Sequence, residues 1–239
     1  MRMRMIMMML VAAAPLFGCG HAHPTASQTG PSSASNAVPT QITTTALPAA
    51  VQGQPPMVID DFESYEQGSR LPWHKAPHGN RVDATIGPNI SGQGRQSMKL
   101  TYQVQPGRGS NYVALMRYQK WDLSGYNALA FWIKPDGQGH SLGLTLNMLD
   151  DQGRQHWNLW NASFEGLGTR VGETAARRVV VPFSSLRQDL TYSPIRDVSS
   201  VFKPSNITEI VFFVAAKNDR FGEGVLYIDD VEAVVIDEP

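Results

Sequence analysis

Two short runs place pairs of carboxylates inside apolar, strand-like sequence. The first reads V-I-D-D-F-E, from Val58 to Glu63, and the second reads Y-I-D-D-V-E, from Tyr227 to Glu232. Neighbouring carboxylates repel each other, and burying one without a partner is costly. We therefore expect another group of the fold to gather these acids.

A third run combines aromatic and polar side chains: R-Q-H-W-N-L-W-N, residues 154–161. Sugars present flat C–H faces and rims of hydroxyl groups, so a site for them needs an exposed aromatic ring beside hydrogen-bonding side chains. Alternation along a strand places His156, Asn158 and Trp160 on one face, and Trp157 and Leu159 on the other. We predict that Trp160 is the sugar platform and that Trp157 lies in the core.

The preceding run, S-L-G-L-T-L-N-M-L, supplies neighbours for this predicted sugar face. Its leucines and Met148 share one parity and should point into the core, whereas Thr145 and Asn147 should point the other way. Arg117 or Tyr118, from M-R-Y-Q, could join from a neighbouring strand. The alternative is that both tryptophans pack inside the protein.

Carboxylates that could hydrolyse a sugar polymer are few. Glycoside hydrolysis normally requires two carboxylates roughly 5–5.5 Å or 6.5–9.5 Å apart. The available acids are Asp150, Asp151 and Glu165, and the first two lie in D-D-Q-G, a run typical of a turn. We expect binding without catalysis, with a glucanase as the alternative.

The first 19 residues have the layout of a secretory signal. Arg2 and Arg4 precede an apolar stretch, Met5 to Phe17, that is too short to span a bilayer comfortably. The stretch ends in L-F-G-C, which resembles a bacterial lipoprotein signal whose cysteine, Cys19, becomes lipidated. With Gly20 next, the resemblance implies an anchor in the outer membrane, if the cell has one. The alternative is ordinary signal cleavage with an unmodified cysteine.

Residues 20–56 contain no Asp, Glu, Lys or Arg and are rich in Ser, Thr, Ala, Gln and Pro. We interpret them as a disordered tether that spans roughly 30–35 Å on average. The folded region is then 57–239, which is one domain by length. Without Arg2 and Arg4 the chain has 18 basic against 21 acidic residues, so it lacks the basic footprint of a nucleic-acid-binding protein.

Short apolar or alternating runs fill the folded region, and turn residues separate them at 135–139, 150–153 and 222–224. This pattern predicts an all-β fold: a β-sandwich of the jelly-roll type, with two antiparallel sheets. The run A-L-A-F-W-I is apolar on both faces, which predicts a central strand. In the last strand the apolar parity switches at Asp229–Asp230, which predicts a β-bulge there.

The run from Trp121 to Gly139 is more specific than a generic strand. It reads W-D-L-S-G-Y-N-A-L-A-F-W-I-K-P-D-G-Q-G, with I-D-D-F-E before it, V-V-V-P-F-S-S-L after it and L-Y-I-D-D-V near the end. In this order the motifs resemble the family 11 carbohydrate-binding modules and the wider galactose-binding-like jelly rolls. The resemblance covers nearly all of Met57 to Asp237.

The resemblance implies a structural Ca²⁺ between the first and last strands. By motif, Glu63 matches the ligand from the first strand and Asp229 the ligand from the last, with Asp61 and Asp230 in reserve. Backbone carbonyls around Gly94 to Gln96 would complete a site of the loose oxygen geometry that calcium accepts. The alternative is that these acids are solvated strand ends or pair with arginines.

The resemblance also implies binding of a polysaccharide, of the β-glucan type, by a lipoprotein of the cell envelope. Two other functions stay open. One is a cellulase or glucanase, since family 11 modules usually accompany cellulases. The other is a protein-binding assembly factor, since the complex I assembly-factor family shares much of the same pattern.

Overall fold

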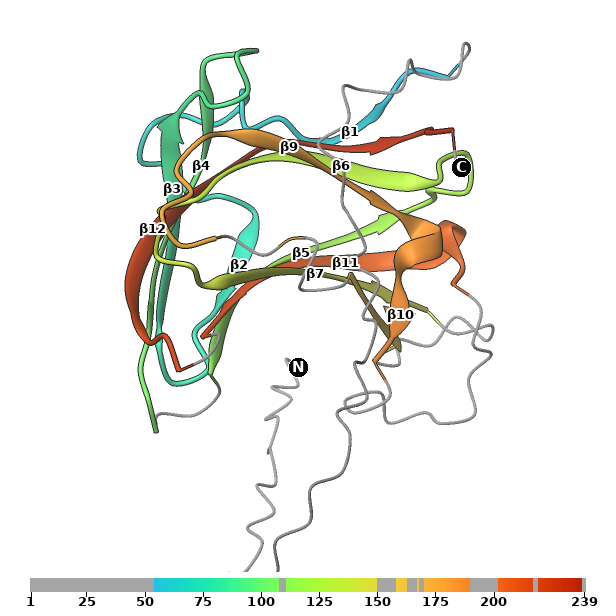
Figure 1. Cartoon of the computed structure of the whole chain (residues 1–239). Helices are drawn as coiled ribbons and strands as arrows, with labels where there is room; N and C mark the ends of the chain where they lie inside the picture. Colours follow the sequence, from blue (N-terminus) through green and yellow to red (C-terminus); the bar gives the residue numbers. More distant parts are fainter. Residues whose placement is uncertain are drawn as a thin grey trace, which may run out of the picture. The chain divides into compact units, whose positions relative to one another are not determined.

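The computed structural model describes residues 54–107, 111–149, 158–162, 167, 170–189, 202–216 and 219–237. All of them belong to one compact unit, Ile42–Pro239. Their strands form two antiparallel sheets stacked face to face (Figure 1). The predicted signal peptide, Cys19 and most of the predicted tether lie outside the described residues.

The upper sheet of Figure 1 has the order β3-β4-β12-β6-β9, and β1 also pairs with β12. Its strands are β1 (Met57–Asp60), β3 (Arg81–Pro88), β4 (Gln96–Val104), β6 (Ala128–Lys134), β9 (Arg177–Pro182) and β12 (Gly222–Val234). The strand β6 carries A-L-A-F-W-I and lies between β12 and β9, so the prediction of a central strand is confirmed.

The lower sheet has the order β10-β8-β7-β11-β5-β2. Its strands are β2 (Trp73–Ala76), β5 (Tyr112–Trp121), β7 (Ser141–Met148), β8 (Asn158–Asn161), β10 (Arg187–Gln188) and β11 (Ile207–Ala215). Two short 3-10 turns among the described residues, η1 (Phe183–Ser185) and η2 (Pro204–Asn206), connect strands. The predicted all-β sandwich with two antiparallel sheets is therefore confirmed.

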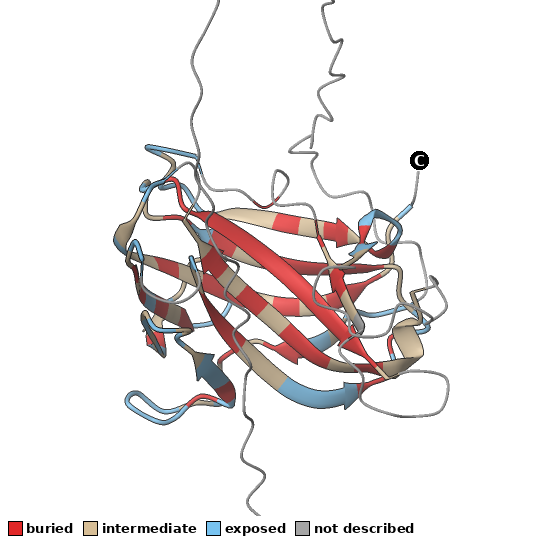
Figure 2. Cartoon of the chain, turned by 90° about the horizontal axis from the view of Figure 1, so that it is seen from below, coloured by how far each residue is buried: buried red, intermediate tan, exposed pale blue. Residues whose placement is uncertain are grey.

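The hydrophobic core lies between the sheets and follows the alternation of the strands. In β7 the residues Leu142, Leu144, Leu146 and Met148 are buried in it, as their shared parity predicts. Thr145 and Asn147 point to the other side of the same strand, yet they are buried as well. Figure 2 looks onto the molecule from below and shows that buried residues run along the long central strands.

A β-bulge interrupts β12 where the sequence predicts one. Asp229 lies opposite Trp132 of β6, whereas Glu232 lies opposite Ala130, so β12 has one residue more than its partner in this interval. Asp230 takes up the extra residue with a left-handed backbone, φ +44°. The bulge lets Ile228 and Val231, which differ in parity, both point into the core.

Candidate functional site

The side of the lower sheet that faces away from the core carries the candidate site, and we call it the outer face. Residues directly opposite each other in an antiparallel pair have side chains on the same side of the sheet. The register aligns one row across four strands: Tyr118, Glu209, Asn147 and Leu159. The neighbouring row consists of His74, Met116, Val211, Thr145 and Asn161.

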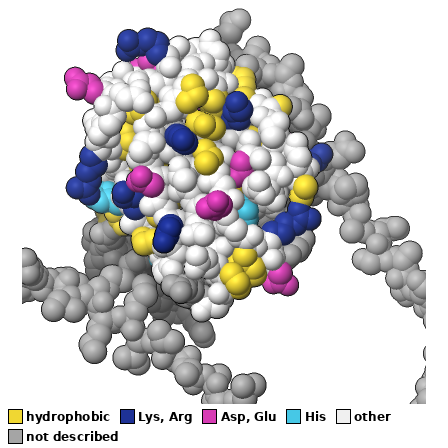
Figure 3. Space-filling view, turned by 90° about the vertical axis from the view of Figure 1, so that its left-hand side faces the viewer, with side chains coloured by type: hydrophobic (Ala, Val, Ile, Leu, Met, Phe, Trp, Pro, Cys, Tyr) yellow, Lys and Arg dark blue, Asp and Glu magenta, His cyan; other side chains and the backbone are white. Residues whose placement is uncertain are grey.

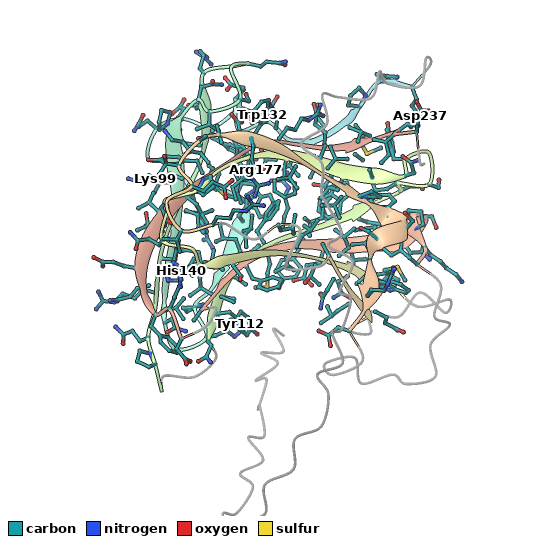
Figure 4. The ribbon with its side chains drawn as sticks, viewed as in Figure 1. Lys99, Tyr112, Trp132, His140, Arg177 and Asp237 are labelled. Carbon is teal, nitrogen blue, oxygen red and sulfur yellow. The ribbon has the colours of Figure 1, made fainter. Side chains whose placement is uncertain are left out.

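Aromatic rings lie on the outer face over β5 and β11. The ring of Phe213 lies across Gly143 of the next strand, where a Cβ atom would come within 2.1 Å of the ring. Tyr112 meets Phe213 edge-on at 6.1 Å between ring centroids, and Figure 4 shows Tyr112 beneath the lower sheet. Tyr118 is 48% exposed, and its ring meets that of His74 at 5.1 Å. Glycine at 143 is therefore what allows a flat ring to rest on this sheet.

Polar side chains continue the outer face over β7 and β8. Thr145 Oγ1 donates a hydrogen bond to Asn161 Oδ1 at 2.6 Å, and Asn161 Nδ2 donates to Asp189 Oδ2 at 2.8 Å. Asn147 Nδ2 donates to Glu209 Oε2 at 3.0 Å. Asn147 Oδ1 is buried and has no hydrogen-bond partner among the described residues. The face thus carries carboxylate and amide groups that hydrogen-bond mainly to one another, and Asn147 and Glu209 are only 2% and 4% exposed.

The electrostatics of the row keep Tyr118 a hydrogen-bond donor. Burial raises the pKa of Tyr118 to about 12, and the charge of Glu209 and a hydrogen bond to it act in the same direction. A phenol with the ordinary pKa of about 10 is already protonated at neutral pH, and the raised pKa extends this state to more alkaline solution.

The prediction that Trp160 is an exposed platform is wrong. Trp160 is only 6% exposed and lies opposite Leu146, whose side chain points into the core. Its ring packs against Phe202 at 5.5 Å between centroids. The outer face of β8 is instead formed by Leu159 and Asn161, which have the opposite parity to the predicted residues Asn158 and Trp160.

The other predicted residues of β7 and β8 divide into two groups. Asn147 lies on the outer face as predicted. The backbone of Asn158 pairs with that of Met148, a core residue, so its register position belongs to the inner side of β8. His156 lies outside the described residues, as do the candidate hydrolytic acids Asp150, Asp151 and Glu165.

Of the two candidates from β5, Tyr118 lies on the outer face and Arg117 does not. Arg117 Nη1 donates to Asp60 Oδ2 at 2.8 Å, and the two side chains are 15% and 3% exposed. The arginine therefore neutralises a buried acid between the sheets, and the prediction that it contacts a sugar is wrong.

The first acidic couplet is thus accounted for by neighbouring groups of the fold. Asp60 also accepts hydrogen bonds from the Trp73 indole at 2.9 Å and from the Tyr65 hydroxyl at 3.2 Å. Burial raises the pKa of Asp60, although the Trp73 hydrogen bond and the Arg117 charge oppose the rise. Asp61 Oδ1 accepts the backbone N–H of Glu63 at 3.1 Å, as in a turn.

Glu63 and Asp229 both contact the loop between β3 and β4. Glu63 Oε1 accepts the backbone N–H groups of Arg95 at 2.7 Å and Gln96 at 2.9 Å. Burial by itself would raise the pKa of Glu63, but these hydrogen bonds and the Arg95 side chain outweigh it, and the pKa is lowered. At the other end of the loop, Ile90 and Ser91 lie close enough to Asp229 to oppose the rise of its pKa, and Asp229 Oδ1 accepts the backbone N–H of Asp230 at 2.9 Å.

Asp229 has the burial and the free acceptor atom that a cation ligand requires. It is 1% exposed, and its Oδ2 atom is buried without a hydrogen-bond partner among the described residues. Burial, followed by the charge of Asp230, raises the pKa of Asp229 to about 6. No three His, Cys, Asp or Glu side chains gather within the part of the chain that the structure describes, so most ligands of a cation here would be backbone carbonyls. The acids therefore fit calcium in part, with Asp229 the better match.

Comparison with known proteins settles which family this sandwich represents. The model of the family 11 carbohydrate-binding domains matches residues 43–236. The chain belongs to this family. No curated protein sequence matches it.

Solved structures of family 11 modules share the fold of this domain. The module of the cellulosomal cellulase Lic26A-Cel5E of Clostridium thermocellum has 21% sequence identity and a TM-score of 0.59, over 78% of this chain and 98% of that one. The Clostridium thermocellum module in complex with a β-1,3-1,4-mixed-linked tetrasaccharide has 21% identity and a TM-score of 0.58, over 82% of this chain and 100% of that one.

No helix among the described residues is both long and apolar enough to cross a membrane.

Proposed function

We propose that this family 11 domain binds a β-glucan-type polysaccharide on the outer face of its lower sheet and does not hydrolyse it. The observation that carries the proposal is the ring of Phe213, which packs over Gly143 on the same face of the sheet as the row Tyr118–Glu209–Asn147. A ring and a row of hydrogen-bonding groups match the two kinds of surface that a sugar presents.

The size of the face favours a polymer over a single sugar. Six strands, at about 4.8 Å per interval, make the sheet roughly 24 Å wide. An extended β-linked chain repeats ring faces and hydroxyl rims along its length and can use such a surface throughout. The mixed-linkage tetrasaccharide bound by a relative of the same fold also supports a β-glucan.

The variant Tyr118→Ala tests the proposed face. Because Tyr118 is 48% exposed, its truncation should change the free energy of unfolding by no more than about 0.5 kcal/mol. Loss of an exposed aromatic contact should raise the Kd for a β-1,3-1,4-linked tetrasaccharide about tenfold in calorimetry. Val58→Ala is a matched control, because Val58 is 56% exposed on β1 of the upper sheet.

An unchanged Kd in Tyr118→Ala, or an equal loss in the Val58→Ala control, would contradict the proposed face. Release of reducing ends from mixed-linkage β-glucan by the purified protein would contradict the non-catalytic part.

We further propose that a lipid on Cys19 anchors the protein in the cell envelope, with residues 20–56 as a tether. The basic, apolar and L-F-G-C segments at the start of the chain support this proposal. Cys19→Ser should move the protein from the membrane fraction to the soluble fraction of producing cells, and an unchanged distribution would contradict the anchor.

We also propose that Asp229 binds a structural Ca²⁺ together with backbone carbonyls of the β3–β4 loop. The buried and unpartnered Oδ2 atom supports this site, since calcium accepts carboxylate and carbonyl oxygens in variable geometry. Glu63, bonded to the backbone at the opposite end of that loop, would hold the loop in place and could add a ligand through Oε2.

A further inference from the structure

A second surface that could recognise a sugar lies on the upper sheet, on the side facing away from the core. Tyr227 of β12 lies between Lys99 of β4 and Lys134 of β6 in the register of the sheet. Its ring rests over Gly87 of β3, where a Cβ atom would come within 2.9 Å of it. A glycine again makes room for a flat ring on a sheet, as Gly143 does for Phe213.

Positive charge frames this ring. Lys134 Nζ lies 5.9 Å from the centroid of the Tyr227 ring, within the range of a cation–π contact. Neither Lys99 nor Lys134 forms an ion pair with another described residue. Figure 3 looks onto the side of the molecule where β3, β4 and β12 lie, and basic, acidic and hydrophobic side chains are interspersed there.

A hollow of about 450 Å³ lies beside the ring. Its lining includes Lys99, Tyr227, the amides of Gln67 and Gln96, and Arg95, and it includes no acid. The side chain of Arg95 is 83% exposed, and its Nε atom lies 3.4 Å from Glu63 Oε2. The hollow therefore combines an aromatic ring, hydrogen-bonding amides and two cations, of which Arg95 is paired with Glu63 and Lys99 has no ion pair among the described residues.

A second ring continues the surface along the sheet. Trp132 lies two residues before Lys134 on β6, which makes it a diagonal neighbour of Tyr227 across the strand pair. Diagonal neighbours in antiparallel strands are roughly 7–8 Å apart. It is half-buried, and its neighbour Arg178 is paired with Glu232 at 2.8 Å. Figure 4 shows Trp132 and Lys99 on the outer side of the same sheet.

We propose that this surface binds an acidic polysaccharide, whose sugar rings pack on Tyr227 and whose uronate carboxylates pair with Lys99 and Lys134. A neutral glucan has no group for these lysines, whereas a carboxylated sugar meets both the ring and the charge. The site is independent of the proposed β-glucan face, since it lies on the other sheet.

The experiment is affinity electrophoresis of the full chain through gels containing polygalacturonate, alginate or fully methyl-esterified polygalacturonate. Esterification removes the carboxylate charge and leaves the polymer otherwise alike. We expect retardation by one or both acidic polymers, none by the ester, and weakening as salt rises, because ion pairs at a surface are screened. The comparison of polygalacturonate with alginate distinguishes the two sources of uronate.

Variants locate the site. Lys99→Gln with Lys134→Gln should weaken binding about tenfold, from roughly threefold for each exposed ion pair. Lys75→Gln, a charge change at a lysine of the lower sheet that pairs with Asp83, should leave binding unchanged. Tyr227→Ala should abolish retardation while Tyr227→Phe, which keeps the ring, retains it.

Tyr118→Ala should leave binding of the acidic polymer unchanged, which separates this site from the proposed β-glucan face. The proposal is overturned by absence of retardation in the acidic gels, by equal retardation in the ester gel, or by equal loss in Lys75→Gln.

Discussion

The buried ion pair between Asp60 and Arg117 should contribute to folding and not to sugar binding. Its nitrogen and oxygen are 2.8 Å apart, and the side chains are only 15% and 3% exposed. Removing one partner of such a pair typically costs 3–5 kcal/mol, because a buried charge is left uncompensated. In Arg117→Met, Asp60 keeps its hydrogen bonds from Trp73 and Tyr65, so we expect the lower end, about 3 kcal/mol.

This loss can be measured as a change in melting temperature. For a domain of this size, 1 kcal/mol corresponds to about 2–4 °C, so Arg117→Met should lower Tm by roughly 6–12 °C. The assay is thermal unfolding by circular dichroism, with Asp60→Asn and the double variant completing a cycle that isolates the coupling. Lys75→Met is the control, because Lys75 and Asp83 are also 2.8 Å apart but 52% and 59% exposed. Breaking that exposed pair should cost under about 1 kcal/mol.

The same variant separates the structural role of Arg117 from a binding role. Below its Tm, Arg117→Met should bind a β-1,3-1,4-linked tetrasaccharide with a Kd within about twofold of that of the unaltered chain. An unchanged Tm together with a tenfold weaker binding of the tetrasaccharide would contradict the structural role and would place Arg117 on the sugar-binding face.

Three further predictions follow from the site and the core. Because Trp160 is only 6% exposed, Trp160→Ala should lower the free energy of unfolding by about 3–5 kcal/mol in urea titrations and leave the Kd of the folded protein for the tetrasaccharide unchanged. Weaker sugar binding without a loss of stability would contradict this. If Asp229 binds Ca²⁺, calcium at 100 times its Kd should add about 2.7 kcal/mol to the free energy of unfolding, and a chelator or Asp229→Asn should remove this gain. Equal melting temperatures in calcium and in chelator would exclude the site. Burial lowers the pKa of the His140 imidazole, so the folded state resists a proton that the unfolded state accepts, and the contribution of His140 to the free energy of unfolding should fall as pH decreases below about 6.5. The difference in stability between the unaltered chain and His140→Gln should fall over the same range, and a difference that does not change with pH would contradict this.

Much of the fold follows from alternation along the chain. The parity of β7 correctly separates Leu142, Leu144 and Leu146 from Thr145 and Asn147. The parity switch in β12 correctly predicts the bulge at Asp229–Asp230. Both inferences succeed because a strand with one face in the core repeats every two residues, and any departure from that repeat requires an irregular backbone.

The candidate site was harder to predict because alternation divides a strand into two faces without saying which one is inside. Trp160 of β8 pairs with Leu146, a core residue, so the side chain of Trp160 points into the core and not to the outer face. The polar residues that precede Trp160 suggested the opposite orientation. Burial of the largest aromatic ring evidently outweighs the polarity of its neighbours.

Residues from distant strands were missed for a different reason. In E-I-V-F-F-V-A-A, alternation alone separates Ile210, Phe212 and Val214 from Val211 and Phe213, and this could have placed Phe213 on the outer face. Its meeting with Gly143 depends on β11 lying beside β7, and these strands are far apart in sequence. The salt bridge of Arg117 to Asp60 likewise spans the two sheets and leaves no local signal.

The position of the sugar on the domain can be measured by ¹H–¹⁵N NMR mapping of the protein during titration with a β-1,3-1,4-linked tetrasaccharide. We expect the largest shift changes on β5, β11 and β7, around Tyr118, Phe213 and Asn147, with little change around Tyr227. Shift changes centred on the upper sheet, with none around Tyr118 and Phe213, would contradict the proposed face.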